Sequence, residues 1–121
     1  MVTLEQFRYC PTHSTHPPFC YDFHYVKPGM VAIFGDNGSG KSTLAQLMAG
    51  WYPDFLPGEI TGTGTLLGTP IGRLPFNEQS ATIQLVQQSP YLQLSGCTFS
   101  VEEEVAFGPE NLCLAEKEIM A

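Results

Sequence analysis

The aromatic residues near the N-terminus follow the two-residue period of a β-strand. They stand at every second position of one stretch: Phe19, Tyr21, Phe23 and Tyr25. Such alternation predicts a strand with one buried face. Residues 2–9 also have the composition of a strand, but their apolar phase shifts between Leu4 and Phe7, which indicates a β-bulge. The N-terminal part is therefore expected to be rich in antiparallel strands.

Farther along the chain, hydrophobic runs of different period predict further strands and a helix. Residues 30–34 form an unbroken apolar run, M-V-A-I-F, typical of a strand buried on both faces. Residues 42–49 carry apolar side chains at helical spacing, and Gly50 is placed to end that helix. Residues 59–68 combine β-branched residues with glycines, which predicts short strands with a tight bend. Residues 81–86 predict another strand.

The C-terminal part has the pattern of two helices. Ser100 and Glu103 match a capping box, in which the serine side chain accepts from the glutamate N–H and the glutamate reaches back. The helix that they begin is expected to run to about Phe107 and to end at Gly108-Pro109. Residues 115–121 predict the first turns of another helix.

A glycine-rich stretch lies between the apolar run at 30–34 and the helix at 42–49. It reads G-D-N-G-S-G-K-S-T over Gly35–Thr43 and matches the P-loop pattern G-x-x-x-x-G-K-S. Glycines permit the backbone angles that turn successive N–H groups toward phosphate oxygens, and the following helix directs its positive end to the same anion. Lys41 is expected to contact the β- and γ-phosphates, and Ser42 to ligate Mg²⁺. The nucleotide-binding residues predicted here are Gly35, Asn37, Gly38, Ser39, Gly40, Lys41, Ser42 and Thr43.

Length and composition are those of one globular domain. The chain has 121 residues, of which 43% are hydrophobic and 14% charged, enough for a modest core. Its net charge is −7 with only five lysines and arginines, so we expect no nucleic-acid surface. No apolar run approaches the roughly 20 residues of a membrane span, and the N-terminus has no signal-like pattern. These features predict a cytoplasmic location.

Cysteines and histidines are scattered along the chain rather than paired. The cysteines contain no C-x-x-C pair and are interpreted as reduced thiols. They are Cys10, Cys20, Cys97 and Cys113. His13, His16 and His24 could hold a metal together with Cys10 or Cys20, but no ligand spacing recurs. Histidines in a loop and on a strand face are the favoured interpretation.

Three segments, in order, resemble the ATP-binding cassette (ABC) transporter ATPases over nearly the full length of the chain. The P-loop has that family's form, G-x-N-G-S-G-K-S-T. Upstream, F-R-Y ending at Tyr9 resembles the adenine-stacking A-loop, which implies that the Tyr9 ring stacks on adenine. Downstream, residues 85–90, L-V-Q-Q-S-P, are similar to the Q-loop, and Gln88 aligns with the family glutamine because it stands two residues before the proline. The resemblance implies that Gln88 contacts Mg²⁺ and the attacking water and acts with Lys41 in catalysis.

The run after the Q-loop resembles one branch of that family. Residues 101–112, V-E-E-E-V-A-F-G-P-E-N-L, are similar to the energy-coupling-factor importers of vitamins and transition-metal ions. By itself the run fits any capped acidic helix equally well. The resemblance also implies that residues 91–96, with Gln93, form part of a groove for a coupling helix of a membrane subunit.

The chain departs from the family pattern after the Q-loop. Leu94–Thr98, L-S-G-C-T, only imitates the L-S-G-G-Q signature and stands too close to the Q-loop. Neither an apolar strand ending in Asp-Glu (Walker B) nor a later switch histidine follows. Residues 1–121 are therefore interpreted as the N-terminal part of a nucleotide-binding domain, with A-loop, Walker A and Q-loop but without signature and Walker B segments. The expected fold class is α/β, an incomplete P-loop NTPase (RecA-like) core with an antiparallel β-subdomain.

The resemblance implies an ATPase subunit of an energy-coupling-factor-type importer, with ATP and Mg²⁺ as cofactors, peripheral on the inner face of the cell membrane. The implied partners are a transmembrane transporter subunit and a second ATPase subunit, without nucleic acid. Because the base and metal-binding aspartate are missing, the 121 residues alone are expected to hydrolyse ATP poorly. A truncated, non-catalytic module that binds nucleotide or docks on a transporter is the alternative. A GTPase would carry N-K-x-D, which is absent, and a small-molecule kinase is disfavoured by only two arginines.

Overall fold

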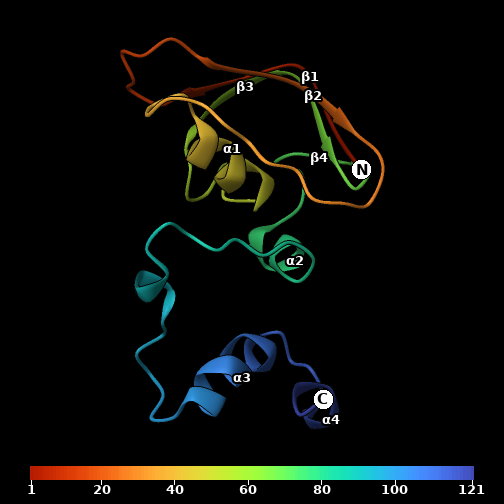
Figure 1. Ribbon diagram of the computed structural model, residues 1–121, viewed down its shortest axis with the longest axis vertical. Helices are drawn as coiled ribbons and strands as arrows, with labels where there is room; N and C mark the ends of the chain where they lie inside the picture. Colours follow the sequence, from red (N-terminus) through yellow and green to blue (C-terminus); the bar gives the residue numbers. More distant parts are fainter. The chain divides into compact units, whose positions relative to one another are not determined.

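The computed structural model describes residues 1–121 as two compact units, Met1–Leu85 and Val86–Ala121 (Figure 1). The elements are β1 Val2–Pro11, β2 Phe19–Tyr25, α1 Lys41–Met48, β3 Gly58–Leu66, β4 Thr69–Pro70, α2 Phe76–Ser80, the 3₁₀ turn η1 Pro90–Gln93, α3 Val101–Asn111 and α4 Glu116–Ile119. The first unit contains a four-stranded antiparallel sheet in the order β2-β1-β3-β4, together with α1 and α2. The second unit contains η1, α3 and α4. The predicted antiparallel β-layer is confirmed.

The central strand β1 contains the predicted bulge. Between Leu4 and Phe7 the strand advances by three residues while β2 advances by two, from Phe23 to Tyr21. Gln6 is the extra residue, with φ of 45°. The bulge turns Leu4 and Phe7 to the same face of the sheet, as the shift of apolar phase predicted.

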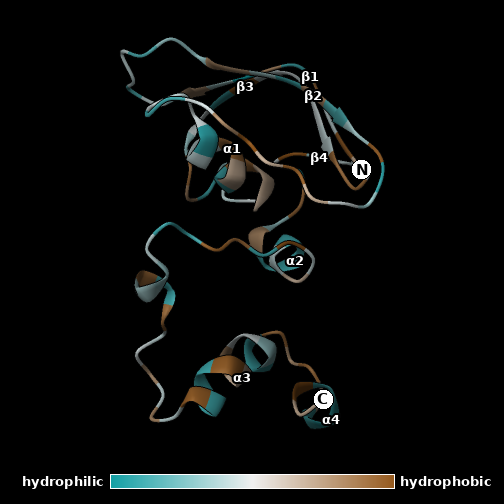
Figure 2. Cartoon of the chain, viewed as in Figure 1, coloured by the Kyte–Doolittle hydropathy of each residue, from teal (hydrophilic) through white to brown (hydrophobic).

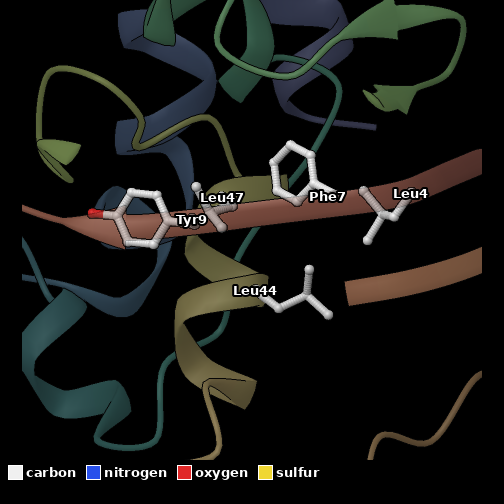
Figure 3. Packing of buried hydrophobic residues seen from close by; sticks show 5 residues of the cluster. All are labelled: Leu4, Phe7, Tyr9, Leu44 and Leu47. Atoms are coloured by element: carbon white, nitrogen blue, oxygen red, sulfur yellow. The ribbon is translucent and has the colours of Figure 1, made fainter. Parts of the chain in front are cut away.

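The core of the first unit lies between β1 and α1. Figure 3 shows Leu4, Phe7 and Tyr9 projecting from β1 beside Leu44 and Leu47 of α1. Tyr9 and Leu47 are 0% exposed, and Leu4 and Phe7 are 1% exposed. Burying side chains of this size contributes about 1.5–3 kcal/mol each, so this small cluster is what fixes α1 on the sheet.

Helix α1 ends as its sequence predicted. Gly50 has φ of 83° and donates its N–H to Leu47 O at 3.2 Å, while Trp51 donates to Gln46 O at 3.1 Å. This pair of bonds is the Schellman motif, which needs a glycine at the left-handed position. A further contact was not predicted: the buried Gln79 of α2 donates from Nε2 to Met48 O at 2.8 Å.

The two predicted core strands, residues 30–34 and 81–86, are not formed. Met30 is 98% exposed, Phe34 is 90% exposed and Val86 is 80% exposed. A buried strand needs hydrogen-bonding neighbours along its edges, and no described segment pairs with either run. Instead, an apolar groove of about 490 Å³ lies beside residues 31 and 33, lined also by β2 and α1. Neither run therefore joins a sheet in these 121 residues.

For residues 59–68 the sequence predicts short strands with a tight bend; the bend is present, but it lies at the end of this stretch and not at the glycines inside it. Strand β3 is continuous from Gly58 to Leu66, and the chain reverses at Leu67 and Gly68, which have φ of 51° and 85°. Gly62, with φ of 83°, lies beside the bulged residue of β1 rather than at a corner. Glycine in a strand marks a close backbone approach here, not a bend.

In the second unit, the predicted cap of α3 is confirmed and its predicted end is wrong. Ser100 Oγ accepts from Glu103 N–H at 3.2 Å, whereas the Glu103 side chain accepts from Phe99 N–H at 2.8 Å. The helix continues through Pro109 to Asn111, and Leu112 N–H donates to Gly108 O at 3.1 Å beyond the proline. Figure 2 shows apolar and polar residues interspersed along α3. The short helix predicted at the C-terminus is confirmed as α4.

Candidate nucleotide-binding site

The P-loop connects the exposed apolar run to the start of α1. Gly38 and Gly40 have φ of 82° and 90°, a left-handed conformation that side chains disfavour. Gly40 is the N-cap of α1, and Ser39 donates its N–H to Asp36 O at 3.2 Å to close the turn. Two of the loop's three glycines therefore adopt the backbone angles that glycine permits.

Lys41 folds back over this loop. Its Nζ donates to Gly35 O at 2.6 Å, to Asp36 O at 2.7 Å and to Ser39 Oγ at 3.3 Å. An ammonium has three donors, so neutral acceptors of the loop engage all of them. A phosphate oxygen is a stronger, charged acceptor and can replace them. In the structure the Lys41 ammonium is thus held by acceptors of the loop itself.

The mouth of the loop is accessible. A Cβ added at Gly38 would meet no atom within 4 Å, and the side chains of Asn37 and Ser42 are exposed. The first N–H groups of α1 have no intrahelical acceptor and carry the positive end of the helix dipole. The exposed Ser42 hydroxyl in the first turn is a hard oxygen ligand of the kind that Mg²⁺ prefers. These residues fit a nucleoside triphosphate with its Mg²⁺ ion.

Strand β2 contacts the loop through two aromatic side chains that the sequence did not identify as part of the site. Tyr21 donates its hydroxyl to Gly40 O at 2.8 Å. A Cβ placed on Gly40 would lie 2.6 Å from both Phe19 Cδ1 and Tyr21 Oη, so only glycine fits there. The alternating pattern predicted that these aromatic residues face inward, but it contained no signal for what they cover.

The structure differs from the expectation for Tyr9. Its ring is 0% exposed and packs edge-on against Tyr52, with ring centroids 6.3 Å apart. Its hydroxyl donates to Pro57 O at 2.9 Å, and burial raises the pKa of this phenol. A ring enclosed in the core cannot offer a face to adenine, so the structure corrects this assignment to a core residue. The reason is tertiary: segments more than 40 residues away cover the ring.

The predicted sensor Gln88 lies in the second unit, with its side chain exposed. Its assignment rests on the sequence resemblance and stays a prediction. Within the same unit, the Glu104 carboxylate accepts from Ser95 N–H, from Ser95 Oγ at 2.7 Å and from Thr98 Oγ1 at 2.6 Å. The bonds from Thr98 and Ser95 lower the pKa of Glu104 and fasten the loop before α3 to its first turn.

Other candidate features do not converge on a second site. No three metal-ligating side chains lie together, and His24 Nδ1 lies 3.0 Å from Thr3 Oγ1. The four cysteines are free thiols. None of the helices is long and apolar enough to cross a membrane.

Left-handed glycines, a lysine held over the loop and a following helix define the P-loop class of nucleotide-binding proteins. Comparison with known families is more specific, because residues 21–117 match the ABC transporter family. The chain belongs to the ABC transporter family, whose ATP-binding domains have a P-loop NTPase fold.

Similar proteins in bacteria and archaea are described as members of the same family. A protein of Bacillus cereus, provisionally described as an ABC transporter ATP-binding protein, is 36% identical over 120 residues, which are 98% of this chain and 21% of the relative. Proteins with the same description are 39% identical over 100 residues in Streptomyces coelicolor and 37% identical over 120 residues in Methanosarcina mazei. The former match covers 81% of this chain and 33% of the relative, the latter 98% and 41%. The chain thus spans about a fifth to two fifths of these relatives' length. No solved structure matches it significantly.

Proposed function

We propose that this chain binds ATP through its P-loop, as the ATPase subunit of an ABC importer that couples ATP hydrolysis to uptake across a membrane. The observation that carries the proposal is the position of Lys41, whose ammonium is held by Gly35 O and Asp36 O at the loop. The descriptions of the relatives as ABC transporter ATP-binding proteins support it.

The proposed binding step is an exchange of acceptors at Lys41. Its ammonium leaves the neutral carbonyls of the loop for the β- and γ-phosphate oxygens, and the charge–charge contact is stronger than the bonds it replaces. The N–H groups of the loop and of the first turn of α1 bind the same phosphates from the backbone. The Ser42 hydroxyl would hold Mg²⁺, which neutralises phosphate charge when bound.

Two roles are proposed from resemblance alone. Gln88 would orient the attacking water and contact the metal, and the segment that follows it would transmit the nucleotide state to a membrane subunit. Because Tyr9 is buried, it has no part in the proposed site. Catalysis also needs a general base and a metal-binding aspartate.

The importer branch is the finer part of the proposal. The run at residues 101–112 forms the acidic, capped helix α3, and its similarity to energy-coupling-factor ATPases favours vitamins or transition-metal ions as cargo. The proposed partners are a transmembrane subunit and a second ATPase subunit. Copurification of the protein with a membrane subunit, followed by ATP-dependent uptake of labelled vitamins or Co²⁺ and Ni²⁺ into vesicles, tests this branch.

Titration of the full-length protein with a fluorescent ATP analogue tests the nucleotide site. Lys41→Ala is expected to abolish measurable binding because it removes the cation at the loop. Lys27→Ala is the matched control, since it removes the same charge from an exposed turn. Wild-type affinity in Lys41→Ala would refute the site. Phosphate release that depends on Lys41 would support an ATPase, whereas binding without turnover would favour a non-catalytic module.

A further inference from the structure

We propose that Tyr21 is a positioning residue of the P-loop, whose hydroxyl holds the Gly40 carbonyl and thereby directs the Lys41 N–H toward bound phosphate. The proposal rests on the nucleotide-binding function proposed above. It assigns to β2, which lies before the P-loop motif in the sequence, a role in shaping the phosphate site.

The Gly40 carbonyl receives two hydrogen bonds. Tyr21 Oη donates to it at 2.8 Å, and the Leu44 N–H of α1 donates at 2.9 Å. A carbonyl oxygen has two lone pairs, so this acceptor is saturated. One donor comes from the helix and the other from the sheet, so the carbonyl cannot rotate without breaking a bond to one of them.

The orientation of this carbonyl determines that of the next N–H. The peptide between Gly40 and Lys41 is planar, and in a trans peptide the N–H points opposite to the C=O. With the carbonyl directed along α1 to Leu44, the Lys41 N–H points out of the helix N-terminus. That N–H is one of the backbone donors that a P-loop offers to phosphate. Gly40 is otherwise free to change, because glycine populates many backbone conformations.

The anchor itself is fixed by the sheet. Tyr21 pairs with Phe7 across β1 and β2, and their rings lie 6.4 Å apart. Burial raises the pKa of Tyr21 to about 12, so the hydroxyl remains a hydrogen-bond donor throughout neutral and mildly alkaline pH. Phe19, two residues before Tyr21, packs against Gly40 from the same strand. Both aromatic side chains therefore contact the loop from β2, a strand that is itself held in the sheet.

The test compares ADP and ATP affinities of full-length wild type, Tyr21→Phe, Tyr25→Phe and Lys41→Ala by calorimetric titration. Tyr21→Phe keeps the ring and removes only the hydroxyl. Loss of one neutral hydrogen bond is expected to lower the affinity for both nucleotides about three- to tenfold. Tyr25→Phe is the control, because Tyr25 lies on the same strand and its ring stacks on Phe23. It is expected to bind like the wild type.

Each titration is run well below the unfolding midpoint of that variant, so a merely structural role would lower the midpoint and leave the affinity unchanged. Equal affinities of Tyr21→Phe and wild type would overturn the role of Tyr21 while leaving the nucleotide site intact. Failure of the wild type itself to bind would overturn the proposed function and this proposal with it. The Lys41 amide resonance gives a second readout: in ADP-saturated Tyr21→Phe it is expected at a different position from the wild type, and coincident resonances would contradict the proposal.

Discussion

Substitutions of Tyr9 distinguish two possible roles of this residue, packing in the core and stacking on a nucleotide. Its ring is fully buried, and its hydroxyl donates to Pro57 O at 2.9 Å. Tyr9→Phe removes this bond, but Pro57 O still accepts from Thr12 N–H at 3.2 Å, so the free energy of unfolding should fall by only about 0.5–1.5 kcal/mol. Tyr9→Ala also removes the ring, and the resulting cavity should bring the loss to about 3–5 kcal/mol.

Urea unfolding of the full-length protein, followed by circular dichroism, measures both losses. With a slope of about 2 kcal/mol per molar urea, a loss of 1 kcal/mol shifts the midpoint by about 0.5 M. Tyr25→Phe serves as the control, because its ring is only partly buried on the neighbouring strand. Nucleotide affinity of folded Tyr9→Phe is expected to equal that of the wild type.

The opposite pattern would refute this reasoning. If Tyr9 stacks on adenine, Tyr9→Ala should weaken ATP binding strongly while leaving the urea midpoint almost unchanged. Such a result would mean that Tyr52 and the carbonyls near residue 57 do not enclose the ring in the nucleotide-bound protein.

Three other perturbations follow from single contacts. Gln79→Leu removes the donor to Met48 O at 2.8 Å and should lower the free energy of unfolding by about 1–3 kcal/mol, measured by urea unfolding; an unchanged midpoint would contradict the contact. Gly40→Ala forces a Cβ onto Phe19 at a φ of 90° and should abolish nucleotide binding on titration; wild-type affinity would contradict the close packing. The pKa of Glu104 is lowered from its ordinary value of 4.5, so its carboxylate stabilises the loop at any pH above 4.5. This contribution is lost as the pH falls below that value and the carboxylate is protonated. The rate of amide hydrogen exchange at residues 95–98 should then increase in acid. If that rate, corrected for the intrinsic rate, does not change with pH, Glu104 does not stabilise the loop.

The features predictable from sequence are those with local causes. The bulge in β1 shifted the apolar phase between Leu4 and Phe7, because an extra residue changes which side chains face inward. The cap at Ser100 and the helix end at Gly50 each depend on bonds within a few residues. The P-loop was likewise visible because its glycines and Lys41 are consecutive in the chain.

The features that escaped prediction depend on partners far away in the sequence. Whether residues 30–34 pair as a strand is decided by neighbouring edges, and the run itself cannot reveal that none is available. The burial of Tyr9 depends on Pro57, and that of Gln79 depends on the Met48 carbonyl. The contact of Tyr21 with Gly40 spans 19 residues and required the position of β2 relative to α1. In each case the outcome depends on residues far away in the sequence, which a local pattern does not specify.

The bulge at Gln6 has an evolutionary consequence. A Cβ on Gly62 would lie 2.1 Å from the Gln6 carbonyl oxygen, so the extra residue requires a glycine on the facing strand. Without position 6, Leu4, Phe7 and Tyr9 would stand two residues apart and reach the same face of a regular strand. No carbonyl would then press on position 62. Among relatives, a side chain at position 62 should therefore occur only together with a one-residue deletion in this strand, whereas the deletion can occur alone.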